Sequence, residues 1–290
     1  MNHANSCAMS LRSTAFWGLS PATLLRELAA NLAMGIAPIR RRRLQGLRTG
    51  DSRVEREAAK ISAEFDFLRD SAGPLQGRTV LEIGPGDALG LAPLFISAGA
   101  AQYIALDRFL GDVWGARAQS LYERVQSLRG PFSARWRERV TLLRASIELD
   151  QPLPEVDLIV SFDVIEHLAD LPLAVHNMRR MLRPNGRMVH RIDYGPHGVW
   201  LSARDPLSFL RVPRWLWAAI GSNRGYPNRV RHGQFTELLR REGLIIAERI
   251  TRSHGQHVLD AEVLCGFDRT ATLGQPFRLD GTGTSGESAC

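Results

Sequence analysis

Residues 79–87 constrain the fold more than any other part of the chain. They read TVLEIGPGD, a short apolar run that predicts a strand buried on both faces and ending in glycines. Glycines in such a turn accept positive φ angles and let a ligand approach the backbone. Asp107 ends the next predicted strand, 23 residues after Gly84, where its carboxylate can accept hydrogen bonds from ribose hydroxyls. The spacing therefore predicts a nucleoside-containing ligand at the carboxyl edge of a parallel sheet.

Apolar runs that predict strands alternate with predicted helices through the central part of the chain. Such alternation is typical of a mostly parallel sheet with right-handed crossovers. The predicted fold class is α/β, a Rossmann-like three-layer sandwich around a mostly parallel seven-stranded sheet with an antiparallel edge strand. The predicted strands are 79–83, 102–106, 140–143, 156–161, 187–192, 244–251 and 258–267, and the predicted helices among them are 88–98, 113–128, 172–182 and 233–241.

The chain divides into three predicted regions: an N-terminal helical extension over 1–70, a ligand-binding domain over 71–269 and a Gly, Thr and Ser rich tail over 270–290. Residues 194–232 interrupt the alternation and are predicted to form an insertion that covers the substrate. In the extension, Ser20 and Pro21 predict the start of one helix, and Ser52 with Glu55 predicts the start of a second.

The first helix of the extension carries an apolar stripe on one predicted face, formed by Leu24, Leu25, Leu28, Leu32 and Ile36. One interpretation is that this stripe packs on the domain as core or as a lid. Four consecutive arginines follow at 40–43, so a peripheral membrane contact through residues 21–43 is the second interpretation. A homodimer surface is the third.

The charge of the chain is +7, and Lys60 is the only lysine. The arginines are scattered and do not alternate with aromatic residues, so we expect no nucleic-acid partner. Cys7, Cys265 and Cys290 lie far apart, which suits a reducing compartment and gives no metal spacing. The N-terminus lacks the succession of a signal peptide, and we expect a cytoplasmic protein, with association at the inner membrane face as the alternative.

The charges around the glycine turn distinguish two kinds of nucleoside cofactor. A dinucleotide would place its pyrophosphate at the start of the following helix, where Asp87 would repel it. Asp87 and Glu82 instead favour a ligand with sulfonium and ammonium groups, as S-adenosylmethionine (SAM) has. A protein that binds NAD remains the competing interpretation.

Four motifs in order resemble the class I SAM-dependent methyltransferases. Glu82-x-Gly84-x-Gly86 is similar to the first motif of that family, with Ala88 where the family has its third glycine, and Asp107 is similar to its ribose-binding acid. Residues 157–168, DLIVSFDVIEHL, resemble the fourth-strand motif of the ubiquinone/menaquinone-type branch, and MLRPNG at 181–186 resembles the turn before the fifth strand. The resemblance covers about 78–193, with a further match over 233–267.

The resemblance implies SAM as the cofactor and S-adenosylhomocysteine as its product. It implies that the loop at 145–147 holds the adenine and that Phe162 and Asp163 line the methionine end. Asp107 has the alternative role of capping the next helix, and Glu166 with His167 could simply begin a helix. The predicted cofactor-binding residues are Glu82, Gly84, Pro85, Gly86, Asp107, Arg108, Ser146, Ile147, Phe162 and Asp163.

A hydroxyl acceptor would also need a general base. His190, Asp193 and His197 lie at the end of the fifth predicted strand and are the candidate catalytic residues. The alternative is that His190 belongs to the core and His197 to the surface. A metal site formed by these three residues is also conceivable, but we assign no metal.

The run from His190 to His232 resembles methyltransferases associated with surface-polysaccharide synthesis, which implies a sugar hydroxyl or a glycosylated small-molecule precursor as the acceptor. Trp215 and Trp217 could stack on sugars or belong to the core, and arginines could pair with phosphate. Two other hypotheses remain: a methyltransferase of a quinone or another secondary metabolite, and a non-catalytic protein that binds SAM.

Overall fold

The computed structural model describes residues 19–39, 51–201, 203 and 205–266, so the predictions for residues 40–43 and 270–290 lie outside the described residues. The strands form a seven-stranded sheet in the order β3-β2-β1-β4-β5-β7-β6. Strands β1 to β5 pair in parallel, whereas β7 is antiparallel to both β5 and β6, which confirms the predicted fold class. The strands are β1 (Thr79–Ile83), β2 (Gln102–Leu106), β3 (Val140–Leu143), β4 (Val156–Phe162), β5 (Leu182–Asp193), β6 (Ile245–His254) and β7 (His257–Gly266).

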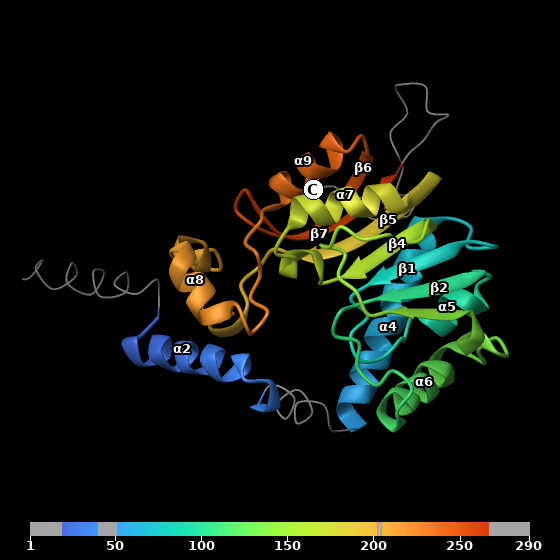
Figure 1. Cartoon of the computed structure of the whole chain (residues 1–290), viewed down its shortest axis with the longest axis horizontal. Coiled ribbons are helices and arrows are strands. Elements are labelled where there is room, and N and C mark those ends of the chain that lie inside the picture. Colours follow the sequence, from blue (N-terminus) through green and yellow to red (C-terminus); the bar gives the residue numbers. More distant parts are fainter. Residues whose placement is uncertain (1–18, 40–50, 202, 204, 267–290) are drawn as a thin grey trace, which may run out of the picture.

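Helices cover both faces of this sheet (Figure 1). Successive side chains of a strand point to opposite faces, so Val80 packs in one core cluster and Leu81 in the other. The first cluster includes residues of α4, α5 and α6, and the second includes residues of α7 and α9. The main helices are α2 (Pro21–Gly35), α4 (Asp51–Ala72), α5 (Ala92–Ser97), α6 (Ala116–Arg129), α7 (Leu171–Met181), α8 (Arg214–Gly221) and α9 (His232–Arg241).

Two of the predicted helices begin later than the sequence pattern indicates. Helix α5 begins at Ala92 rather than at residue 88, because the preceding loop packs closely against α4. A Cβ atom on Gly90 in this loop would lie 2.3 Å from Cδ1 of Ile61. Helix α6 begins at Ala116, where Gly115 is the N-cap. The loop before α5 therefore stays free to line a pocket at the edge of the sheet.

The insertion packs with α2 in a separate cluster beside the sheet, which we call the insertion lobe: α2 together with residues 198–226 (Figure 1). Glu27 of α2 accepts hydrogen bonds from Arg224 and Tyr226, and Asn31 accepts one from the backbone N–H of Asn223, 2.8 Å away. The apolar core of the lobe consists of Trp200, Phe209, Val212, Leu216, Trp217 and Ile220.

This arrangement divides the leucines of the apolar stripe of α2 between buried and exposed positions. Leu24 and Leu28 pack against the lobe, but Leu25 and Leu32 are 67% and 71% exposed. The polar residues Glu27 and Asn31 are the buried ones, because they form the bonds to the insertion. No helix in the described ranges is both long enough and apolar enough to cross a membrane.

Candidate active site

Two adjoining pockets lie at the carboxyl ends of β1, β2 and β4, and Gly84 lines both of them. Their volumes are about 230 Å³ for the first and about 250 Å³ for the second. Ligand pockets usually measure about 300–1,000 Å³, so a ligand as long as SAM would occupy both. The predicted cofactor residues are divided between them.

The glycine turn at the junction of the pockets depends on the absence of side chains. Gly84 has a φ angle of +71°, and a Cβ atom there would lie 2.6 Å from Cγ2 of Val164. Gly86 has a φ angle of +77° with open space around its Cβ position, so its need for glycine is conformational. The turn therefore keeps the backbone between β1 and α5 open to a ligand.

The first pocket contains the residues predicted to hold ribose and adenine. Asp107, Arg108, Ser146 and Ile147 all line it. Oδ1 of Asp107 accepts a hydrogen bond from the backbone N–H of Phe109 at 2.6 Å, which fixes the carboxylate at the end of β2. Within the described residues, Oδ2 has no hydrogen-bond partner and remains available to a ligand. The Asp107 carboxylate thus stabilises a local turn. It does not cap the next helix, because α6 begins only at residue 116.

The second pocket contains Glu82, Pro85, Gly86 and Phe162. Glu82 is buried, and its carboxylate accepts a hydrogen bond from the hydroxyl of Tyr103. Burial raises the pKa of Glu82 to about 8, although the bond from Tyr103 favours the ionised form. A cationic group of a ligand beside this carboxyl would favour its ionisation.

Asp163 lines a pocket of the site, and its role at the methionine end stays a prediction. It lines the first pocket rather than the second, and its φ angle is +53°. Its carboxylate is bonded to Arg191 at 2.9 Å and to Lys60 at 3.2 Å. Burial opposes its ionisation, but the hydrogen bond and charge of Arg191 hold the pKa of Asp163 below its ordinary value. This carboxylate therefore already has cationic partners within the chain.

Helix α4 contributes pocket residues that the sequence analysis missed. Arg53, Glu57, Lys60 and Glu64 line the second pocket together with residues of the glycine turn. Their spacing of four, three and four residues places them on one side of the helix. This polar stripe, which contains the only lysine of the chain, was the sequence signal that could have identified them. The pocket thus offers groups of both signs to a zwitterionic ligand.

The three candidate catalytic residues do not lie together. His190 is fully buried in the sheet, where its Nδ1 is 2.7 Å from Oγ of Ser161, and burial lowers its pKa to about 3. It lines neither pocket. Asp193 and His197 do approach each other, with 3.9 Å between Oδ2 and Nε2. The structure therefore separates His190 from the two residues at the end of β5, in line with the alternative that it belongs to the core.

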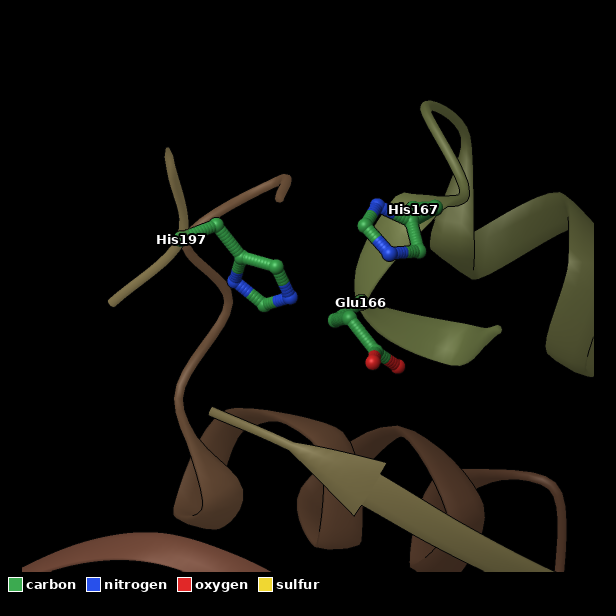
Figure 2. Close-up of side chains that lie close together, drawn as sticks. All are labelled: Glu166, His167 and His197. Atoms are coloured by element: carbon green, nitrogen blue, oxygen red, sulfur yellow. The ribbon is translucent and has the colours of Figure 1, made fainter. Parts of the chain in front are cut away.

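His197 instead lies close to Glu166 and His167, the pair that follows β4 (Figure 2). Its ring lies 5.3 Å from the ring of His167, at an angle of 76°. Glu166 lies beside them and is 3% exposed. Burial raises the pKa of Glu166 to about 8, and burial with the nearby His197 lowers that of His167 to about 4. His167 also lines the first pocket, so this cluster borders the predicted cofactor site.

The end of the insertion holds this cluster in place. Asn228 donates hydrogen bonds from its side chain to the carbonyl oxygens of Ile165 at 3.0 Å and Leu168 at 2.9 Å. Its backbone N–H donates to the carbonyl of Glu166 at 2.5 Å. The short helix η2 (Ile165–His167) is thereby fixed between the pocket and the insertion lobe.

The tryptophans and arginines of the insertion mostly serve the lobe itself. Trp217 is buried in the lobe core, whereas Trp215 is 70% exposed. Arg229 donates to the carbonyl of Val212 at 2.5 Å, and Arg231 donates to that of Val258 at 2.5 Å. These guanidinium groups therefore have partners within the chain, which weakens the prediction that they bind phosphate.

One comparison with known proteins identifies the family. The profile of a methyltransferase-domain family matches residues 52–248. A SAM-dependent methyltransferase of Mesorhizobium loti is 17% identical over 70% of this chain and 97% of its own, with a TM-score of 0.47. Magnesium protoporphyrin IX methyltransferase of Synechocystis, solved with bound S-adenosylhomocysteine, is 15% identical over 72% of this chain and 82% of its own, with a TM-score of 0.45. A search of curated protein sequences finds no match.

The pockets fit the cofactor that this family implies. The glycine turn leaves room for a ligand to contact the protein backbone, and the Asp107 carboxylate has an oxygen available to ribose. The second pocket offers both acidic and basic groups to the amino-acid end of the cofactor. The family match covers more than half of the chain and includes all these residues. The chain belongs to the methyltransferase-domain family and is a class I methyltransferase that uses S-adenosylmethionine.

Proposed function

We propose that the chain transfers the methyl group of SAM to a hydroxyl of a sugar or of a glycosylated small-molecule precursor. One observation supports this proposal: a polar cluster of Glu166, His167, Asp193 and His197 borders the first pocket, which His167 lines. A quinone ring would favour an apolar, uncharged wall. Hydroxyl groups need partners when they leave water, and this cluster supplies them.

The chain must hold the hydroxyl in line with the reactive methyl group and remove its proton. When bound, SAM supplies an electrophilic methyl group on its sulfonium sulfur. A bond from the acceptor oxygen to the methyl carbon forms as the sulfur–carbon bond breaks, and the hydroxyl proton passes to a base. Alignment of the two groups supplies much of the rate enhancement in such a reaction.

Asp193 is the residue we assign as the proton acceptor. Its Oδ1 is fixed by the backbone N–H of Gly195 at 2.7 Å and by Arg252 at 3.3 Å. Its Oδ2 points to the side of His197, 3.9 Å from Nε2, at the carboxyl end of β5. His190 is not used, because it is enclosed in the core and bonded to Ser161.

The test is a methyl-transfer assay with radiolabelled SAM and two panels of acceptors, one of sugars and nucleotide sugars and one of catechols and other quinone precursors. We expect label in the first panel. Asp193→Asn should lower kcat about 100-fold or more, because general-base catalysis contributes about 10²–10⁴-fold, without changing SAM affinity. Asp150→Asn, at a carboxylate that is 83% exposed, is the matched control and should leave kcat unchanged.

Two results would contradict the proposal. Label found only in the catechol panel would favour the quinone hypothesis. SAM binding without methyl transfer to either panel would favour a non-catalytic protein. If Asp193→Asn kept full kcat with a sugar acceptor, the acceptor class would stand and the assignment of the base would be wrong.

A further inference from the structure

The carboxylate of Glu166 is buried, and no side chain of the described structure donates a hydrogen bond to it. The residue is 3% exposed, and only backbone groups, those of Glu166 and Asp193, favour its ionised form through hydrogen bonding. A buried carboxyl group without side-chain partners is unfavourable whether it is ionised or protonated, since even the protonated form has a hydroxyl to donate. Such a group indicates that something further binds to it.

Two histidines offer ring nitrogens to the same space. Ligand atoms of Glu166, His167 and His197 all lie within 4.8 Å of one another. Figure 2 shows the two rings and the carboxylate converging from η2 and from the loop that follows β5. Groups brought together in this way from separate elements are typical of a binding site.

The outer contacts of both histidines leave one nitrogen of each ring available. Nδ1 of His197 is 3.3 Å from the carbonyl oxygen of Gly195, and the ring of His167 is hydrogen-bonded to the backbone of Gly225. Histidines that bind metals usually donate their second N–H to such a carbonyl, which fixes the tautomer and orients the ring.

We propose that Glu166, His167 and His197 bind a divalent transition-metal ion, of which Zn²⁺ fits best. Two imidazoles with one carboxylate are a ligand set that zinc accepts, with a fourth position left for water or substrate. Mg²⁺ and Ca²⁺ prefer oxygen ligands throughout and fit less well. The carboxylate of Asp193 lies beside this cluster, 3.9 Å from Nε2 of His197.

The ion would join the cofactor side of the molecule to the insertion. His167 lines the first pocket, and His197 belongs to the first residues of the insertion. This inference goes beyond the proposed acceptor, because the ion binds to the protein alone. Its test needs neither SAM nor an acceptor, so the two proposals can fail separately.

The experiment is a calorimetric titration of the full chain, free of affinity tags and chelators, with ZnCl₂. We expect one zinc ion per chain, and an excess of Mg²⁺ should not compete. His197→Ala and Glu166→Gln should each weaken the binding about tenfold or more. His176→Ala is the matched control, because His176 also faces a single carboxylate, that of Glu242 at 3.2 Å, on an exposed surface.

Three results would overturn the proposal: no zinc binding by the unmodified chain, equal loss in His176→Ala and His197→Ala, or unchanged binding in His197→Ala. Absorption spectra with Co²⁺ provide a second measurement, since bands of a tetrahedral site should appear in the unmodified chain and disappear in His197→Ala. Circular dichroism checks that the variants fold. If Glu166→Gln does not fold, the partly exposed His197 still decides the question.

Discussion

In the cofactor half of the molecule, the site residues directly follow the ends of β1, β2 and β4, whereas the insertion lobe, which we propose as the acceptor half, is assembled from distant segments. Gly84, Asp107 and Phe162 each lie within one residue of a strand end. The acceptor half instead depends on bonds such as those of Glu27 to Arg224 and Tyr226, across 197 and 199 positions of the chain.

This difference shows that the two halves derive their geometry from different sources. The sheet fixes the cofactor half, because every strand end is held by neighbouring parallel strands. The acceptor half is fixed by its own apolar cluster and by polar bonds to α2. A change in one half should therefore leave much of the other intact, and four predictions test this independence.

The largest effect is expected from Glu27→Ala. Glu27 is 3% exposed, and its loss would leave the guanidinium of Arg224, whose side chain is 18% exposed, without its carboxylate. Breaking a buried ion pair costs about 3–5 kcal/mol, so α2 and α8 should exchange their amide hydrogens much faster. SAM affinity should stay within about twofold of the original. Arg26→Ala, at a position 69% exposed, is the control; a parallel loss of SAM affinity in Glu27→Ala would show that the halves are not independent.

Gly84→Ala should weaken SAM binding by about 100-fold. The substitution combines a positive φ angle, which costs about 1–2 kcal/mol, with overpacking against Val164, which costs about 1–3 kcal/mol. Calorimetry with SAM measures the effect. Gly77→Ala has a similar φ angle of +73° but open space, so it should lower stability without affecting SAM. Equal effects of the two variants on SAM affinity would argue against the position of Gly84 in the site.

Glu82→Gln should change how the stability of the protein depends on pH. The pKa of Glu82 is about 8 in the folded chain, against 4.5 for an ordinary glutamate. Between these values the unfolded chain releases a proton that the folded chain keeps, so the original protein loses about 1.4 kcal/mol per pH unit as pH rises. The variant lacks this loss. Its free energy of unfolding, measured with urea, should therefore rise relative to that of the original protein between pH 5 and pH 8. Parallel stability profiles of the two proteins would rule out the raised pKa.

The smallest effect is expected from Asp107→Ala, with a loss of SAM affinity of more than tenfold. The reason is the removal of the hydrogen bond from a ribose hydroxyl to the available carboxylate oxygen, since a bond to a charged group contributes about 1.5–3 kcal/mol. Titration calorimetry with SAM and S-adenosylhomocysteine measures it, with the exposed Asp150→Ala as control. An unchanged affinity would assign Asp107 to the local turn with Phe109 alone.

The same contrast explains how far the sequence could predict the structure. The glycine turn, Asp107 and the loop at Ser146 were predictable, because each of them follows a strand that can be recognised from the local pattern of apolar residues. The engagement of Asp163 by Lys60 was not, since the two are separated by 103 positions and meet only through the packing of α4 on the sheet. The alternation of apolar residues also could not reveal that His190 is enclosed while Asp193 is not.

The insertion lobe was the least predictable part. The leucine stripe of α2 indicated a buried apolar face, yet Leu25 and Leu32 are exposed because Glu27 and Asn31 have partners in the insertion. A helical pattern identifies apolar positions but does not reveal which polar residues will find a buried partner. Tertiary partners decided the orientation of this helix.

The bonds of Asn228 to η2 connect the cofactor pocket to the insertion, with a consequence for the affinities of the two substrates. His167 lines the cofactor pocket and Asn228 lies near the end of the insertion, so an acceptor bound beside the insertion would contact the same short helix as SAM. Binding free energies at two linked sites are reciprocal. Whatever factor an acceptor adds to the affinity for SAM, SAM must add to the affinity for that acceptor, so a screen for acceptors is most sensitive when S-adenosylhomocysteine or SAM already fills its pocket.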